Sequence, residues 1–243
     1  MSKHVLRHFG LVMLTLIACV TLVMASPDLL PEPQAPGGSK PRASIPIMPP
    51  ETIPTLQLPP PQTSGGRPLM QVLKDRQSSR EFSSQKLSPQ VLSNLLWAAF
   101  GVNRPESGKR TAPSAMNWQE IDIYVATQDG LYLYDAKANA LNLVLNQDVR
   151  AATGQQPFVK EAPVDLVYVA DLAKTGRVGG EDQILYTAAD TGFIAQNVYL
   201  FCASEGLAVV VRGSVDRAAL AKLIKLRPDQ KIILAQTVGY PKK

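Results

Sequence analysis

The chain has 243 residues, a formal net charge of +5 and an apolar fraction of 45%. Its two histidines, His4 and His8, lie in an N-terminal segment that we expect to be removed or held in a membrane, so the working part of the chain has no imidazole. This disfavours zinc and non-haem iron sites and excludes the usual histidine-dependent hydrolases, but it leaves open redox chemistry through an organic cofactor. The small, dispersed charge predicts no nucleic-acid partner.

Residues 1–25 are typical of a secretory signal peptide. Lys3 and Arg7 precede an uncharged apolar run over residues 9–25 that ends in small residues. We expect cleavage near Ala25 and export to the periplasm or cell envelope. Two alternatives stay open: lipidation at Cys19, because residues 16–19 resemble a lipobox, and retention of the run as a membrane anchor. All three place the rest of the chain outside the cytoplasm.

Residues 26–68 hold thirteen of the twenty prolines, which predicts an extended, disordered linker. The linker would serve as a membrane or cell-wall tether, or simply as a spacer with no partner. Residues 69–243 have the composition of one globular domain. After cleavage near Ala25 the domain keeps only Cys202, so no intrachain disulfide can form, and the apolar neighbours of Cys202 predict a buried structural thiol.

The domain is predicted to mix helices and strands. A helix is expected from Leu69, and a second begins at Ser88-Pro89 and ends at Gly101. Strands are predicted over 121–125, 131–134, 141–145, 164–170, 209–211 and 232–234, with a turn at 129–130. A long helix over 184–205, apolar on almost all sides, ends at Gly206, and another follows over 216–226. These intermingled elements predict an α+β sandwich.

Two polar clusters are candidates for binding an anionic, heterocyclic cofactor. Arg76 and Arg80 share one face if the first helix continues, and guanidinium groups bind phosphate through paired hydrogen bonds, with Ser78 as a short donor between them. Alone, this pattern is more typical of a solvated helix face.

The second cluster, Pro113, Ser114 and Asn117, immediately precedes a predicted strand, where ligands are often bound. Asn117 can donate and accept at the pyrimidine edge of a flavin, or it can bond local backbone instead. Read jointly, the two clusters predict a site for flavin mononucleotide (FMN).

A series of motifs, in this order, resembles the nitroreductase family of FMN-dependent oxidoreductases. The motifs are Arg76-x-Ser78-x-Arg80-x-Phe82, residues 97–104 (WAAFGVNR) and 110–115 (RTAPSA), Asn117-x-Gln119, Asp190-x-Gly192-x-x-x-Gln196-Asn197, Glu205-Gly206-Leu207 and Gly239-Tyr240-Pro241. Residues 131–135 and 140–144 further resemble the branch of SagB-type dehydrogenases, which includes azoline-oxidising enzymes.

This resemblance implies a nitroreductase-like sandwich with a mostly antiparallel central sheet. It also implies a homodimer that holds FMN at the subunit interface, with the helix of residues 184–205 at the dimer core. The residues that would face the phosphate are Arg76, Ser78 and Arg80, together with Lys242 or Lys243. The residues that would lie along the flavin ring, from one subunit or its partner, are Pro113, Ser114 and Asn117. The chain near Gly206 would pass close to the face of the ring. NAD(P)H would be the electron donor and a small organic molecule the acceptor, and no catalytic side chain is assigned.

The chain departs from the family pattern in places. The Lys-Tyr pair of azoline oxidases is absent from residues 175–185, with Lys174 and Tyr186 the nearest candidates, which argues against heterocycle oxidation. Ala208 stands where a glycine is common. Export also removes the protein from cytoplasmic NAD(P)H. The alternative is a non-catalytic flavin- or partner-binding module on the same fold, tethered in the envelope; a hydrolase is disfavoured by the missing histidines.

Overall fold

The computed structural model describes residues 54–243; the predicted signal peptide and residues 26–53 of the predicted linker lie outside them. The helices are α1 (Leu69–Asp75), α2 (Pro89–Phe100), α3 (Gly180–Glu205) and α4 (Arg217–Leu223), with short 3-10 helices η1 (Ala115–Asn117), η2 (Arg150–Ala152), η3 (Pro157–Lys160) and η4 (Leu172–Lys174). The strands are β1 (Thr55–Gln57), β2 (Val102–Arg104), β3 (Lys109–Arg110), β4 (Ile121–Thr127), β5 (Gly130–Asp135), β6 (Ala140–Leu145), β7 (Val164–Asp171), β8 (Ala208–Arg212) and β9 (Gln230–Gly239).

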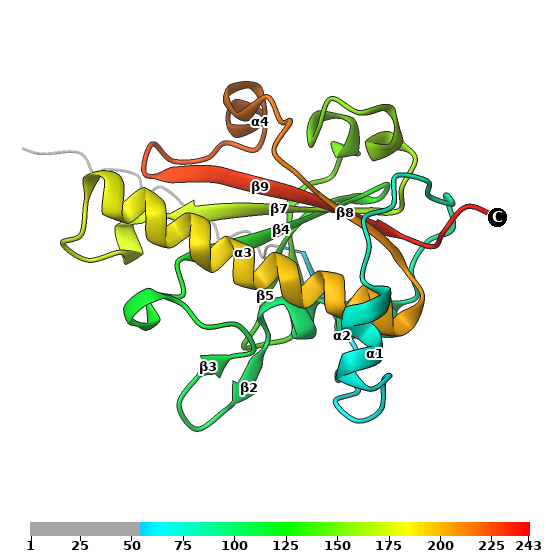
Figure 1. Ribbon diagram of the computed structural model, residues 1–243. Coiled ribbons are helices and arrows are strands. Elements are labelled where there is room, and N and C mark those ends of the chain that lie inside the picture. The colour runs from blue at the N-terminus through cyan, green and yellow to red at the C-terminus, as the bar shows by residue number, and fades with distance from the viewer. Residues whose placement is uncertain (1–53) are drawn as a thin grey trace, which may run out of the picture. The chain divides into compact units, whose positions relative to one another are not determined.

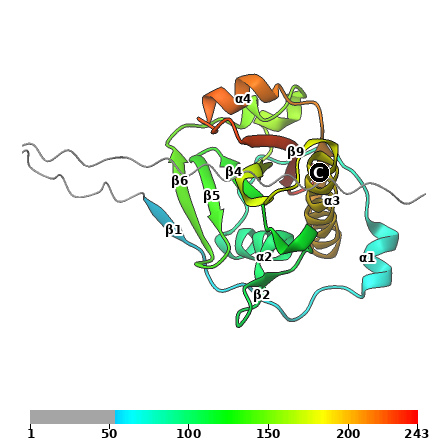
Figure 2. The same ribbon diagram turned by 90° about the vertical axis from the view of Figure 1, so that its left-hand side faces the viewer.

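Seven strands form one sheet in the order β1-β6-β5-β4-β7-β9-β8, and every neighbouring pair is antiparallel. Helices α2 and α3 cover one face, and α4 lies over the other (Figures 1 and 2). All eight residues of the interior strand β7 are buried because both faces of the sheet are covered there. The predicted α+β sandwich with a mostly antiparallel sheet is therefore confirmed.

Local sequence signals explain where helix α2 begins and what it buries. The Ser88 side chain accepts a hydrogen bond from the Val91 amide at 3.3 Å, and Pro89 occupies the first helical position. Leu95, Leu96 and other residues at helical spacing face the sheet with almost no exposure. Both ends of this helix agree with the sequence prediction.

Helix α3 has two apolar sides. Ile194, Val198 and Cys202 are buried against the sheet, whereas Leu185 and Phe193 on the other side are 63% and 48% exposed. Burial raises the pKa of the Cys202 thiol well above its usual value, consistent with the predicted structural role. The helix ends where Gly206 adopts a left-handed conformation at φ 70°, a common way to end a helix. Among residues 54–243, no helix is long and apolar enough to cross a membrane.

The folded part begins earlier than the predicted boundary at Leu69. Residues 55–57 form edge strand β1 against β6, the Leu143 amide donates to the Pro54 carbonyl at 2.9 Å, and Leu58 is only 3% exposed. Residues 54–58 therefore belong to the sheet and not to a disordered linker, and the helix predicted from Leu69 begins at that residue. An edge strand needs few backbone donors, so the proline-rich composition that suggested a linker is compatible with it.

A buried ion pair joins the two strands that flank β9. Arg212 of β8 donates to Asp165 of β7 at 2.9 Å and to the hydroxyl of Thr237 at 2.9 Å, and its remaining nitrogen donates to the Thr153 carbonyl at 2.7 Å. Asp165 is fully buried, and burial raises the pKa of its carboxyl although Arg212 opposes that shift. Both charges therefore depend on each other for compensation.

Replacement of Arg212 by leucine should lower the free energy of unfolding by about 3–5 kcal/mol, because a buried carboxylate loses its cation. Urea denaturation at neutral pH measures the loss. The matched control is Arg227→Leu, whose ion pair with Asp171 includes an arginine side chain that is 53% exposed, so its loss should be much smaller than that of Arg212→Leu. Equal losses in the two variants would contradict this account.

Candidate functional site

The chain segment after α1 carries the predicted phosphate-binding residues, but it is not helical. Helix α1 ends at Asp75, and Arg76 has an extended ψ of 120°. The Ser79 amide then donates to the Val209 carbonyl at 2.9 Å, so the segment crosses to strand β8. The prediction that one helix face presents Arg76 and Arg80 is wrong, because hydrogen bonding to β8 replaces helix continuation.

Tyr199 of helix α3 holds this segment in place. Its hydroxyl lies 2.8 Å from the Ser78 hydroxyl and accepts a hydrogen bond from the Val211 amide at 2.9 Å. The Arg76 guanidinium lies over the Tyr199 ring, 5.3 Å from its centre, in a cation–π contact. Tyr199 therefore positions both Arg76 and Ser78, and it does so from the buried side of α3.

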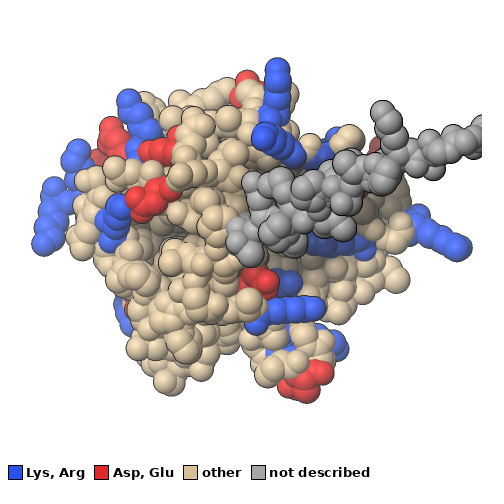
Figure 3. All heavy atoms as spheres, turned by 180° about the vertical axis from the view of Figure 1, so that it is seen from behind, with Lys and Arg blue, Asp and Glu red and all other residues tan. Residues whose placement is uncertain are grey.

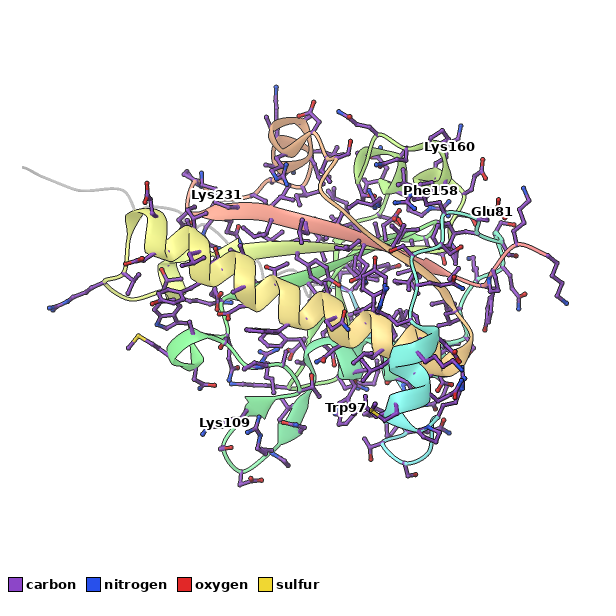
Figure 4. All side chains as sticks on the ribbon, viewed as in Figure 1. Glu81, Trp97, Lys109, Phe158, Lys160 and Lys231 are labelled. Atoms are coloured by element: carbon purple, nitrogen blue, oxygen red, sulfur yellow. The ribbon has the colours of Figure 1, made fainter. Side chains whose placement is uncertain are left out.

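The C-terminus brings further cations to the same end of the sheet. Phe82 pairs with Pro241 in an isolated antiparallel bridge, and the Lys242 amide donates to the Glu81 carbonyl at 3.3 Å. Figure 4 shows Glu81 at the end of the molecule where the chain terminates.

We call Arg76, Arg80, Lys242 and Lys243 the cationic cluster. No ion pair between described residues uses any of the four. The surface view shows basic side chains at the corresponding margin, with acidic side chains among them (Figure 3). The cluster is therefore available to an anion.

A small cleft opens beside this cluster at the end of α3. It has a volume of about 260 Å³ and is lined in part by Ser79, Gly206, Leu207, Val209 and Pro241. A side chain at Gly206 would meet no atom within 4 Å, so this left-handed residue faces open space. A larger cavity of about 1030 Å³ shares Gly206 and Pro241 with this cleft and is lined by Lys242 and Lys243 as well. Ligand sites usually have volumes of roughly 300–1,000 Å³, so this end of the domain has room for a cofactor.

The loop of residues 113–119, which we call the ring-edge loop, lies at a different place on α3. The Ala115 amide donates to Asp190 Oδ2 at 2.8 Å, and the Gln119 amide donates to the Ser114 hydroxyl at 3.0 Å. Asn117 has a φ of 56°, and its side-chain oxygen accepts from Gln119 at 3.2 Å. Ser114 and Asn117 thus shape the loop through local hydrogen bonds, while Pro113 is exposed.

The two predicted clusters are not brought together within one chain. Their anchors on α3, Asp190 and Tyr199, are nine residues apart, which is roughly 13 Å along the helix and two and a half turns. The anchoring side chains therefore leave α3 at opposite edges of its buried face. The structure groups Arg76, Ser78, Arg80, Gly206 and Lys242 at one end, and it leaves Pro113, Ser114 and Asn117 at the other.

Sequence reasoning did not assign roles to two residues that organise these segments. Tyr199 lies within an apolar helix, and no local pattern distinguishes it from a core aromatic. Glu120 follows the ring-edge loop directly and is completely buried, which is rare for a carboxyl group. Its signal in the sequence is an acidic residue immediately before an apolar strand.

The fold and these segments are those of a known class of redox proteins. Residues 73–240 match the model of the nitroreductase family, and the chain belongs to that family. It is 33% identical over 169 residues to a candidate nitroreductase of Methanocaldococcus jannaschii, an alignment that covers 65% of this chain and 85% of the relative. The protein is therefore a nitroreductase-family oxidoreductase.

Solved structures agree with this assignment. The crystal structure of a candidate nitroreductase from Ralstonia eutropha JMP134 superposes with a TM-score of 0.75 and 44% identity, covering 78% of this chain and 90% of that one. The microcin synthetase McbBCD complex of E. coli is also similar, with a TM-score of 0.60 and 19% identity over 74% of this chain and 76% of that one. This second likeness is one of fold alone, so membership of the SagB-type branch stays a prediction.

Replacement of Tyr199 by phenylalanine should lower the free energy of unfolding by about 1–3 kcal/mol, because the Val211 amide and the Ser78 hydroxyl lose their shared partner. Thermal or urea denaturation measures this. The control is Tyr186→Phe, which keeps the edge contact between that ring and Trp118 and should change stability by less than about 0.5 kcal/mol. A Tyr199→Phe variant as stable as the parent would refute the anchoring role.

Proposed function

We propose that the protein is an exported, homodimeric, FMN-dependent oxidoreductase that passes electrons from NAD(P)H to a small organic acceptor. The observation that carries this proposal is the cationic cluster, whose four cations have no ion-pair partner among the described residues. Two of them, Lys242 and Lys243, line a cavity together with the left-handed residue Gly206. A cluster of this kind suits a phosphomonoester attached to a planar group.

Arg76, Arg80 and Lys242 are the residues that would hold the FMN phosphate. Arg76 is already oriented by the Tyr199 ring, so little side-chain freedom would be lost on binding. Lys242 is brought next to the Arg80 segment by the backbone pairing of residues 81–83 with 240–242. Ser78 would contribute less, because its hydroxyl is already bonded to Tyr199.

A second subunit would complete the site. The outer side of α3 exposes Ile184, Leu185 and Phe193 by 56%, 63% and 48%, and α1 nearby exposes Met70 by 77%. Such an apolar surface is typical of a subunit interface. Because the ring-edge loop and the cationic cluster lie apart within one chain, the loop of the partner subunit is the one that would lie along the flavin ring.

When bound, FMN would take electrons from the donor and deliver them to the acceptor. The chain would bind and orient the cofactor and shield it from water, and no protein acid is needed for hydride transfer to the ring. Export is supported by the composition of residues 1–25, and a tether by the prolines that follow. The donor available outside the cytoplasm then becomes the main biochemical question.

The substrate is proposed to be something other than an azoline. Lys174 donates to Asp122 at 2.8 Å, and Tyr186 packs edge-on against Trp118 at 5.9 Å between ring centres. These two residues, the nearest candidates for the Lys-Tyr pair, are therefore engaged in separate contacts. A small planar acceptor such as a quinone or nitroaromatic fits the proposed redox role better.

The protein purified from Ser26 onward should be yellow or take up added FMN, and NADH should bleach it without oxygen. The double variant Arg76→Ala and Arg80→Ala should lose FMN, because each charge-assisted hydrogen bond is worth ~1.5–3 kcal/mol. Equilibrium dialysis or fluorescence titration with FMN gives the affinity.

The control for this experiment is Arg104→Ala, which removes an exposed arginine from the β2–β3 hairpin and should leave FMN affinity unchanged. A colourless protein that refuses FMN would remove the enzyme proposal. Bound flavin that no donor reduces would favour the alternative of a non-catalytic binding module.

The variant Phe193→Glu should be monomeric and should bind FMN at least about a hundredfold more weakly, because a charge buried in the interface costs several kcal/mol. Sedimentation velocity reports the oligomeric state. Leu56→Glu is the matched control, since Leu56 is 52% exposed but lies on edge strand β1. A dimer that survives Phe193→Glu would place the interface elsewhere.

A further inference from the structure

The ring-edge loop has a strained backbone. Met116, Asn117 and Gln119 all have positive φ, at 49°, 56° and 50°, a conformation that residues other than glycine seldom adopt. Such a backbone persists only where surrounding contacts determine it. The contacts that hold this loop therefore decide where Ser114 and Asn117 lie.

One of these contacts ties the loop to helix α3. Asp190 is 3% exposed, and its Oδ2 accepts from the Ala115 amide at 2.8 Å. The Arg110 guanidinium also holds the loop, donating to the Gln119 side chain at 2.8 Å. The loop is thus held by two separate contacts, and Asp190 is its partner on α3.

The carboxyl group of Glu120, the residue directly after the loop, accepts no hydrogen bond from the described residues. The residue is completely buried, and neither side-chain oxygen receives a hydrogen bond from a described donor. The ionisable groups that face it are Asp190 of α3 and Lys174 of η4. Lys174 is already 2.8 Å from Asp122 and 3.9 Å from Asp171, so it does not neutralise Glu120 alone.

Two buried carboxyl groups side by side cannot both be ionised cheaply. Burial, reinforced by Asp190, raises the pKa of Glu120 from 4.5 to about 7. As a neutral acid, Glu120 has one O–H to donate, and Asp190 is the acceptor beside it. That arrangement leaves Asp190 Oδ2 for the Ala115 amide.

We propose that Glu120 is a positioning residue for the ring-edge loop: its protonated carboxyl donates a hydrogen bond to Asp190, which in turn holds the Ala115 amide and sets Ser114 and Asn117. The functional consequence rests on the proposed role of that loop at the flavin. Glu120 itself is buried and would not touch the cofactor.

This arrangement makes the conformation of the ring-edge loop depend on pH. The pKa of Glu120 in the folded protein lies above its usual value, so the ordered loop is favoured at low pH and is lost as pH rises through about 7. Above that pH two neighbouring carboxylates repel each other and the tether to Ala115 weakens.

The loop carries its own probe. The chain has two tryptophans, and Trp118 lies in the loop with its ring against Tyr186. In the protein without added FMN, tryptophan fluorescence measured from about pH 5 to about pH 9 should show a transition centred near neutral pH. The transition should vanish in Trp118→Phe, which leaves only Trp97.

The decisive variant is Glu120→Gln, which keeps a neutral donor at the same place and cannot ionise. It should hold the loop at every pH and show no transition. Glu181→Gln, an identical change at an exposed position in the first turn of α3, should keep the transition. A transition that persists in Glu120→Gln, or a parent protein with none over this range, would overturn the proposal.

A second measurement links the loop to the cofactor. The FMN affinity of the parent should be about tenfold lower at about pH 9 than at about pH 6, and this dependence should be flat in Glu120→Gln. Because the fluorescence arm uses no flavin, a protein that shows the loop transition but binds no FMN would contradict the proposed function and leave the positioning role of Glu120 standing.

Discussion

The packing of helix α3 against the antiparallel sheet is the interaction on which the rest of the structure depends. Its inner side must be apolar to cover β4, β7 and β9, yet it carries two polar anchors, Asp190 and Tyr199. Each anchor fixes a different segment of the chain. Because the anchors lie at opposite edges of that inner side, one helix organises two candidate half-sites that lie apart within one chain. The outer side of the same helix is apolar, which is why we propose a second subunit there.

Much of the fold follows from local chemistry. Ser88-Pro89 and Asp216 start helices where they were expected, since each side chain accepts a backbone hydrogen bond, and Gly206 ends α3. Strand β9 is the instructive failure: only residues 232–234 were predicted, but it runs over Gln230–Gly239. Gln236 and Thr237 are polar and fully buried, and their partners are Tyr168 and Asp165 on β7, so tertiary hydrogen bonds decide what no local pattern shows.

The candidate site was also only partly predictable from the sequence. The residue types of the cationic cluster could be recognised in the sequence, because guanidinium and ammonium groups are what a phosphate requires. Their grouping could not, since it depends on α1 stopping at Asp75, on a tyrosine in a distant helix, and on the pairing of residues near 82 with residues near 241. The spacing of Arg76 and Arg80 along the chain suggested that they share one helix face. In the structure, the segment that carries them is held instead by a backbone hydrogen bond from Ser79 to strand β8.

The position of strand β9 has a consequence for the order of folding. This strand follows β7 and β8 in the chain but lies between them in the sheet. Strand β8 therefore has no strand partner until β9 has paired with β7, about sixty residues away in sequence, and pairings between such distant segments form slowly. We infer that the edge formed by β8 joins the sheet late in folding.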